Sequence, residues 1–413
     1  MNPSSSVVEE ACPEYFRWIH EDLRPWKVTG ISREMVERGR VVAHIRVVVV
    51  GGKLYVENYK RAFQTRDVIT VWGILQLLRL YPGKLPDLDL MFECGDKPVI
   101  LKQDYKGSEA TTPPPMFHYC GDDQTHDIVF PDWSFWGWSE INIKPWEILK
   151  KDLKQSSDKV KWMDREPYAY WKGNTLLGPA RRDLVKCNAS KNKEWNTRIY
   201  DLDWRRERKE GFKTTDLESQ CTHRYKIYVE GYAWSVSQKY ILACDSMSLV
   251  IDSQYYDFYT RGLLPTVHYW PISENEKCKS INFAVKWGNR YTKEAQDIGK
   301  AGSKFIQEEL RMRYVYDYMF HVLYQYAKLL KYQPTVPKGA LEVCSETLIC
   351  NSKGLRRKFR SYSMVNKPSD SSPCTLQPPF DQLTLQDLLR RKENQTKQIE
   401  LWEASENIRR NYS

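Results

Sequence analysis

The stretch EGYAWSVSQKYILACDS, residues 230–246, places a glycine, a tryptophan and two serines ahead of a short helical pattern. The segment before it, HRYKIYVE, alternates in polarity and is predicted to be a strand. In an open parallel sheet, ligands bind beyond the carboxyl ends of the strands, and free amides at a helix start attract anions. Gly231, Trp234, Ser235 and Ser237 are therefore candidates for diphosphate binding. The alternative is an ordinary helix capped by one of the serines.

A second segment, YWKGNTLLGPARRD at residues 170–183, has the same strand, turn and helix order. It carries three cationic side chains, those of Lys172, Arg181 and Arg182. Guanidinium groups bind phosphate oxygens through paired N–H groups, and a departing nucleotide diphosphate needs fixed donors for its growing charge. The two turns support each other as anion sites in one predicted sheet, whereas either alone indicates little.

A carboxylate that could act as a base stands in FECGDKP, residues 92–98. Asp96 comes just after a predicted strand, beside a glycine and ahead of a proline, where the backbone leaves the sheet. Such a carboxylate could remove the proton from a hydroxyl nucleophile. The alternative is a turn aspartate that binds its own backbone.

Two D-L-D tripeptides, at residues 87–89 and 201–203, could hold a divalent metal. Carboxylates spaced by two in a strand are also produced by a single solvated face, which is the interpretation preferred here. The sequence contains no C-x-x-C pair, G-x-S-x-G, Walker A or G-x-G-x-x-G pattern. No metal site is predicted.

The elements that must position these residues follow from the hydrophobic pattern. Residues 41–57 predict two strands joined at Gly51 and Gly52, and a helix is expected from Asp67. Beyond residue 165, strands and helices alternate, with INFAVKW (residues 281–287) as the last strand, which predicts a parallel sheet flanked by helices. Long helices are expected over 292–331, and the remainder is expected to be a linker and a polar helix.

The composition of the 413 residues fits a large globular protein, because 41% of them are hydrophobic. The net charge of +10 is spread over 63 basic and 53 acidic residues, and the 15 Trp and 26 Tyr suit contacts with sugars or nucleotides. No RNA-binding signature is present, so nucleic acid is not predicted as a partner. Neither a signal-peptide pattern nor an apolar run of membrane-spanning length is found.

Eight segments, in this order, resemble family 90 glycosyltransferases, which include the Rumi-like protein O-glucosyltransferases and a large plant branch. They are CPEYF, CGDKP, HDIVFPDWSFWGW, PWEILKKDL, YAYWKGN with ARRD, CTHRYKIYVEGYAWSVSQKYILACDS, DFYTRGLLPTVHYWPI and AGSKFIQEELRM. The resemblance covers about residues 10–335 and leaves the basic tail outside it. The residues of the sixth segment are most similar to the plant branch.

The resemblance implies an α/β fold of the GT-B type, with two Rossmann-like domains facing a cleft. We expect an acceptor-side domain at 1–165, a nucleotide-sugar domain at 166–310, a helix at 311–335 that packs back across the domains, and a basic, partly disordered tail at 336–413. It also implies inverting transfer of glucose or xylose from UDP-glucose or UDP-xylose, without an obligatory metal or other cofactor, to a protein or polysaccharide acceptor.

The resemblance also implies roles for individual residues. Asp96 falls at the position of the general base. The donor-binding positions are Asn174, Arg182, Tyr232, Ala233, Trp234, Ser235, Val236 and Ser237. Arg181 is a rival to Arg182, because the intervening loop is two residues longer than in the family. The O-glucosyltransferases have an arginine where this chain has Ser237, with Lys239 following, so the donor sugar stays open.

Further residues are assigned on the same basis. Trp136, Trp138 and Glu140 are expected to contact the sugar, with core packing as the alternative for the tryptophans. The resemblance implies a Cys221–Cys244 disulfide, and N-x-S/T sites stand at Asn188, Asn394 and Asn411. Together these favour the lumen of the endoplasmic reticulum or Golgi, although the membrane anchor usual in this branch is absent from this chain. A catalytically inactive glycan-binding or scaffold protein of the same fold is the alternative.

Overall fold

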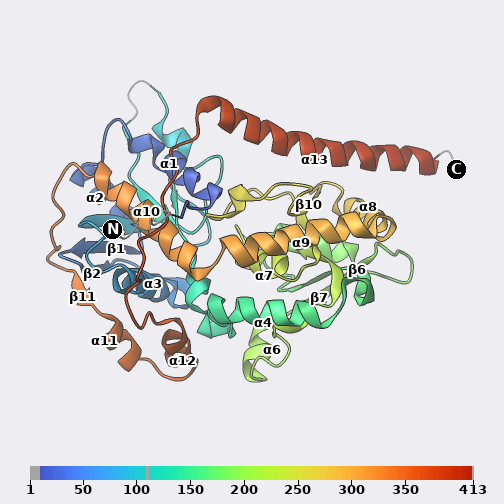
Figure 1. The fold of residues 1–413 in the computed structure, drawn as a ribbon, viewed down its shortest axis with the longest axis horizontal. Helices are drawn as coiled ribbons and strands as arrows, with labels where there is room; N and C mark the ends of the chain where they lie inside the picture. The colour runs from blue at the N-terminus through green and yellow to red at the C-terminus, as the bar shows by residue number, and fades with distance from the viewer. Residues whose placement is uncertain (1–9, 108–110, 412–413) are drawn as a thin grey trace, which may run out of the picture. The chain divides into compact units, whose positions relative to one another are not determined.

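The computed structural model describes residues 10–107 and 111–411, and side chains up to residue 406. Its contacts divide the chain into two compact units (Figure 1). The first unit contains the residues up to Pro131 together with Met312–Ser352 and Met364–Phe380. The second contains Asp132–Arg311, Lys353–Ser363 and the residues from Asp381 onward. The first boundary by contacts thus lies at Pro131, whereas the sequence placed a domain change near residue 165.

The first unit is built on a mixed six-stranded sheet in the order β11-β2-β1-β3-β4-β5. β1 is antiparallel to both β2 and β3, while β3, β4 and β5 are parallel. The predicted hairpin is confirmed, because β1 and β2 are joined by two glycines that both have positive φ. The strand bounds are β1 Ile45–Val50, β2 Lys53–Asn58, β3 Leu88–Phe92, β4 Met116–His118, β5 Ile128–Val129 and β11 Leu341–Val343.

Two long helices support the central strands of this sheet. α3 has nearly continuous buried side chains, and α10 contacts both α3 and β3. The Tyr326 hydroxyl of α10 donates to the Asp89 carbonyl at 2.9 Å, and the Tyr81 hydroxyl donates to Asp317. The helices of this unit are α1 Trp18–Asp22, α2 Arg33–Arg38, α3 Arg66–Leu80, α10 Met312–Leu329 and α11 Ser345–Cys350.

The second unit contains a five-stranded sheet in the order β10-β9-β8-β6-β7, and every neighbouring pair is parallel. The prediction of a parallel sheet is confirmed. The strands are β6 Glu166–Gly173, β7 Thr197–Asp201, β8 His223–Tyr228, β9 Met247–Ile251 and β10 Trp270–Ile272. The helices are α4 Trp146–Lys159, α5 Pro179–Leu184, α6 Trp204–Lys209, α7 Gln238–Leu242, α8 Lys277–Arg290, α9 Thr292–Glu309, α12 Gly354–Ser363 and α13 Gln382–Asn411.

Alternate residues of the central strands face opposite sides of the sheet and pack into two apolar layers in this unit. Ile227 and Leu249 belong to a large core with residues of α8 and α9. Their neighbours Tyr228 and Val250 pack on the opposite face with Ile241 of α7. Helices therefore cover both faces of the sheet, and the edge at the carboxyl ends of the strands carries the turns.

The prediction that INFAVKW forms a strand is wrong, because the segment lies inside α8. Its buried residues include Ile281, Ala284, Val285 and Gly288, which follow the spacing of one helix face. Gly288 is needed for close packing, since a Cβ there would lie 2.6 Å from the ring of Tyr225. A short apolar run cannot by itself distinguish a strand from a buried helix turn.

Residues after 335 contribute to both units. β11 extends the first sheet by pairing with β2, and Cys374 forms a disulfide with Cys12. Ile399 of α13 belongs to the core of the second unit. Much of the expected tail is therefore ordered by pairing and burial. No helix in the described ranges is both long and apolar enough to cross a membrane.

Candidate functional site

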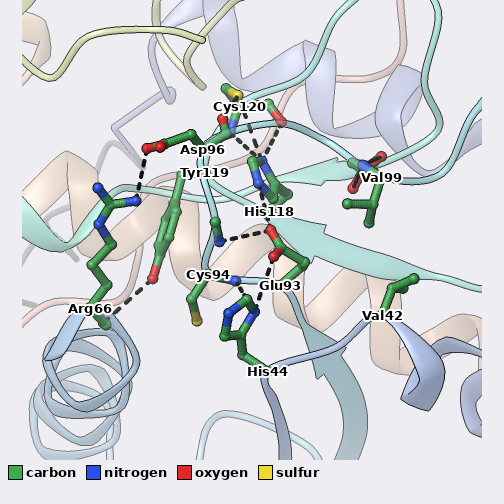
Figure 2. Close-up of polar contacts among 12 residues, drawn as sticks. Val42, His44, Arg66, Glu93, Cys94, Asp96, Val99, His118, Tyr119 and Cys120 are labelled. Atoms are coloured by element: carbon green, nitrogen blue, oxygen red, sulfur yellow. Dashed lines mark hydrogen bonds and ion pairs between the residues drawn. The ribbon is translucent and has the colours of Figure 1, made fainter. Parts of the chain in front are cut away.

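Asp96 lies just beyond β3, where the chain leaves the first sheet (Figure 2). Its side chain is 47% exposed, and Oδ1 accepts a hydrogen bond from Arg66 at 2.9 Å. Arg66 is the first residue of α3, and its side chain is only 7% exposed. Asp96 is therefore exposed enough to reach a substrate hydroxyl, as a base must be. Its carboxylate is also held by the guanidinium of a buried arginine from another element.

Behind Asp96, a buried carboxylate stands between two histidines. Glu93 Oε1 lies 3.0 Å from Nδ1 of His44, and Oε2 lies 2.9 Å from Nε2 of His118 (Figure 2). The amide of Gly95 also donates to Oε2 at 2.8 Å. A Cβ at Gly95 would lie 2.7 Å from Glu93 Oε1, so only glycine fits here without displacing the carboxylate. The turn that presents Asp96 is therefore anchored by Glu93.

The pKa values of Glu93 and His118 follow from burial and mutual contact. Burial acts to raise the pKa of Glu93, but hydrogen bonds from His118 and His44 lower it to about 2. Burial acts to lower the pKa of His118, and its bond to Glu93 more than offsets this, so the pKa is raised. The trio was not predicted from the sequence, because His44, Glu93 and His118 stand far apart in the chain; the only local signal was that Glu93 is close to Asp96.

The two candidate donor turns of the second unit contact each other. They follow β6 and β8, which are parallel neighbours, so both leave the same edge of the sheet. Gly178 in the first turn has φ +83°, and a Cβ there would lie 2.4 Å from the carbonyl oxygen of Gly231 in the second. The backbones approach as closely as two glycines permit.

Arg181 connects these turns from within. Its Nε donates to the carbonyl of Glu230 at 3.1 Å, and its terminal nitrogen donates to Ser235 Oγ at 3.1 Å. Burial lowers the pKa of Arg181 to about 10. Arg182, by contrast, is exposed and donates to the Leu176 carbonyl at 3.1 Å. The buried arginine shapes the turn, whereas the exposed one leaves its guanidinium at the surface.

Hydroxyl groups organise the turn after β8. The amide of Ser235 donates to the Tyr228 hydroxyl at 3.0 Å, and the hydroxyls of Ser235 and Ser237 lie 2.9 Å apart. α7 begins after Ser237, whose own side chain makes no cap bond. The Ser237 amide donates to Ser235 Oγ at 3.4 Å, so the alternative of a helix start capped by a serine stays open. Of the other expected donor residues, those exposed or half-buried are Tyr232, Val236 and Asn174, and those buried are Ala233 and Trp234. Asn174 Oδ1 accepts the amide of Leu176 at 2.9 Å.

Lys239 does not place a positive charge at the surface of this turn. Its side chain is fully buried, and Nζ lies 2.9 Å from Asp132 Oδ2, which is also fully buried. Burial acts to lower the pKa of Lys239, but Asp132 raises it overall. The ion pair ties α7 to the segment after Pro131, so Lys239 does not take the place of the arginine that the resemblance implies at the position of Ser237.

The aromatic residues expected to contact sugar are mostly packed inside. Trp136 is 1% exposed, and the ring of Trp138 makes a T-shaped contact with Trp133 at 5.0 Å. Glu140 Oε1 accepts from Arg356 at 3.0 Å, and its Oε2 accepts from Ser139 at 2.9 Å. Burial favours the core-packing alternative for Trp136. Trp138 and Glu140 stay candidates.

Carboxylates of the D-L-D tripeptides are engaged in hydrogen bonds or ion pairs within the protein. Asp89 is fully buried and binds Arg46 through two bonds of 2.7 Å, so it does not lie on the solvated face expected for it. Asp203 Oδ1 accepts two amides at the start of α6, and Asp201 Oδ1 accepts the amide and hydroxyl of Thr175.

The structure contains the Cys221–Cys244 disulfide that the resemblance implied, and it adds Cys187–Cys278 and Cys12–Cys374. The latter two pairs were missed, because spacing alone does not reveal pairing. Among the glycosylation candidates, the Asn188 amide donates to the Ile199 carbonyl at 3.1 Å, and Asn394 is exposed on α13. The side chain of Asn411 lies outside the described residues.

Comparison with known proteins gives a consistent picture. Residues 7–403 match the profile described as Glycosyl transferase family 90, so the match includes most of the tail that the resemblance had left out. Human Protein O-glucosyltransferase 1 is 27% identical over 356 residues, covering 82% of this chain and 86% of the relative. The O-glucosyltransferase rumi homolog of Aedes aegypti is 26% identical over 340 residues, covering 78% and 80%. O-glucosyltransferase rumi of Drosophila melanogaster is 25% identical over 345 residues, covering 80% of each chain.

Proposed function

Because the chain belongs to glycosyl transferase family 90, we propose that this glycosyltransferase moves glucose from UDP-glucose to a hydroxyl group of a protein, with inversion at the anomeric carbon. The relatives named as protein O-glucosyltransferases support this choice of sugar and acceptor. UDP-xylose and a polysaccharide acceptor are the alternatives. Glucose and xylose differ by one hydroxymethyl group, which a pocket discriminates by about 1–3 kcal/mol.

The observation that carries donor binding is the meeting of the two glycine turns after β6 and β8. The amides and the serine hydroxyls of the second turn are suitable donors to the oxygens of a diphosphate. We assign Arg182 and Asn174 to the rim of this donor site. Arg181 acts as a positioning residue, since its hydrogen bonds go to Glu230 and Ser235.

Asp96 is assigned the role of general base in the transfer. Its carboxylate takes the proton of the acceptor hydroxyl while the hydroxyl oxygen forms a bond to the anomeric carbon. The bond from that carbon to the UDP oxygen breaks, and the negative charge that develops on UDP is stabilised by the donor turns. Arg66 keeps the Asp96 carboxylate in place through its ion pair.

The test is a panel of UDP-glucose, UDP-xylose, UDP and GDP-glucose in thermal unfolding, followed by turnover with a protein acceptor. A ligand at 100 times its dissociation constant adds about 2.7 kcal/mol to stability. We expect stabilisation by the uridine nucleotides alone and turnover that survives EDTA, since no metal is assigned to the reaction. Affinity for UDP without turnover of any UDP-sugar would instead support the inactive glycan-binding alternative, and a flat response would reject the donor site.

The secretory lumen is proposed as the compartment in which the enzyme works. Three disulfides connect six of the ten cysteines, and disulfides persist chiefly in oxidising compartments. Thiol labelling of unfolded protein from its native source should therefore modify four cysteines before reduction and all ten after it. Labelling of all ten before reduction would contradict the proposal.

A further inference from the structure

Tyr119 and Cys120 follow strand β4 and lie beside Asp96 (Figure 2). β3 and β4 are parallel neighbours, so the residues that follow each strand leave the same edge of the sheet together. Both side chains are fully buried. They therefore belong to the support behind the Asp96 turn and not to the surface that meets a substrate.

Cys120 contacts the backbone of Asp96 itself. Its thiol donates to the Asp96 carbonyl at 3.5 Å, and Sγ also lies 3.6 Å from Nδ1 of His118. The same ring nitrogen lies 3.2 Å from the Cys120 amide and 3.0 Å from the Cys120 carbonyl oxygen. An unprotonated Nδ1 accepts from the amide and a protonated one donates to the carbonyl, so His118 holds the backbone of Cys120 in either state.

Tyr119 contacts the arginine that pairs with Asp96. Its hydroxyl lies 3.4 Å from the main-chain carbonyl oxygen of Arg66 and 2.7 Å from Oγ1 of Thr70 (Figure 2). Thr70 Oγ1 in turn donates to the same Arg66 carbonyl at 2.9 Å. Two buried hydroxyls from different elements thus hold the first residue of α3, whose guanidinium binds the Asp96 carboxylate.

The backbone just ahead of Arg66 is strained. Gln64 and Thr65 have φ values of 51° and 56°, in the left-handed region that residues other than glycine rarely adopt, and threonine is β-branched. Such conformations persist only where the surrounding structure fixes them, and they cluster at functional sites. The contacts of Tyr119 and Thr70 supply that constraint at the start of α3.

We propose that Tyr119 and Cys120 are positioning residues for Asp96: Cys120 fixes the Asp96 backbone, and Tyr119 fixes the arginine that orients its carboxylate. This role rests on that of Asp96 as the proposed base. A base must be aligned with the proton it removes, and a small displacement of an aligned group costs much of its effect on the rate. The donor turns belong to the other unit, so loss of either contact should lower kcat and leave UDP affinity unchanged.

The experiment compares variants of the full chain by steady-state transfer to a protein acceptor, by UDP titration and by thermal unfolding. Tyr119→Phe removes the hydroxyl and keeps the buried ring. Tyr318→Phe is the matched control, because Tyr318 is equally buried in the same unit and its hydroxyl donates to a main-chain carbonyl of β5 at 3.4 Å. Cys120→Ala removes the thiol, whereas Cys120→Ser keeps a donor at that position.

Tyr119→Phe and Cys120→Ala should each lower kcat by about three- to tenfold, the effect of one lost hydrogen bond expressed at the base. Cys120→Ser should recover most of the loss, and Tyr318→Phe should keep the wild-type kcat even if it unfolds at a lower temperature. The proposal is overturned if Tyr119→Phe or Cys120→Ala keeps the wild-type kcat, or if UDP affinity falls with kcat. It is also overturned if Tyr318→Phe loses as much activity as Tyr119→Phe, or if Cys120→Ser is no more active than Cys120→Ala.

Asp96→Asn, measured alongside, separates this proposal from the proposed function. A wild-type kcat in Asp96→Asn would reject the base and the positioning role with it, as would a wild-type chain that transfers no sugar. Loss of activity in Asp96→Asn, together with wild-type activity in the Tyr119 and Cys120 variants, would reject the positioning role alone.

Discussion

Asp96 and the donor turn each follow a largely buried strand, but different interactions hold them in place. In the first unit, the turn that presents Asp96 is anchored by charged side chains: Glu93 with its two histidines, and Arg66. In the second unit, the turns are held by backbone contact at Gly178 and by Arg181, whose bonds go to a carbonyl and a hydroxyl.

The difference shows what each region can tolerate. Contacts between charged groups depend on protonation, so the turn anchored by Glu93 should respond to pH where Glu93 and His118 titrate. The backbone contact in the second unit contains no group that titrates, so it should not depend on pH. It has no spare volume, so adding a single methyl group should disturb the donor turn. The expected effects below are arranged from the largest to the smallest.

Asp96→Asn should have the largest effect on catalysis. It removes the proposed base while the amide keeps the size of the side chain, so kcat should fall by about 10² to 10⁴. UDP affinity should be unchanged, because the donor turn belongs to the other unit. Steady-state kinetics and UDP titration measure the two effects. A variant with the wild-type kcat would show that another group takes the proton.

Glu93→Gln should destabilise the first unit in a pH-dependent way. The pKa of Glu93 is about 2 against an ordinary 4.5, so its contribution is present above pH 4.5 and is lost as pH falls toward 2. The pKa of His118 is raised above 6.5, so its contribution is present below pH 6.5 and is lost as pH rises through the folded value.

The stability difference between wild type and Glu93→Gln should therefore be largest between pH 4.5 and 6.5. Its size should be about 3 kcal/mol, from the shift of the Glu93 pKa. Denaturant unfolding at a series of pH values measures it. Glu14→Gln is the control, because Glu14 forms an exposed ion pair with Arg17 whose loss should cost about 0–1 kcal/mol. A difference independent of pH would contradict the assigned charges.

Gly178→Ala should lower the stability of the second unit by about 2 kcal/mol or more. Its φ of +83° with ψ of 159° lies in a region that essentially only glycine adopts, which costs another residue about 1–3 kcal/mol, and the added methyl group meets Gly231. UDP affinity should fall with it. Gly211→Ala is the matched control: its φ is +71° and a Cβ there meets nothing within 4 Å. Equal losses in the two variants would mean that the contact between the turns is unimportant.

Arg181→Met and Arg182→Met should separate positioning from direct binding, with the smallest effects of the series. Arg182→Met should weaken UDP by about tenfold without loss of stability, since one charge-assisted contact to phosphate is removed. Arg181→Met should lower both stability and UDP affinity, because it removes the hydrogen bonds that Arg181 donates to the Ser235 hydroxyl and the Glu230 carbonyl. If Arg182→Met binds UDP normally, Arg182 does not contact the donor.

Local sequence pattern predicted the parts of the fold that depend on short-range order. The glycine hairpin, helix α3 and the parallel sheet of the second unit all followed from period and turn residues. The pattern failed at INFAVKW, because a run of seven residues is too short to separate a strand from a buried helix turn. After residue 335, the polar helix expected at the end of the chain is present as α13, but the pattern did not predict the disulfide and the strand pairing that join this part to distant residues.

The sequence by itself determined that a strand, a glycine turn and a short helix occur twice, and that Asp96 follows a strand. Tertiary structure decided which of two adjacent arginines enters the donor turn, because consecutive helical residues point about 100° apart and only packing selects the inward one. It likewise brought His44 and His118 to Glu93. Charges that far apart in the chain become partners only when strands align them, and no local pattern encodes that alignment.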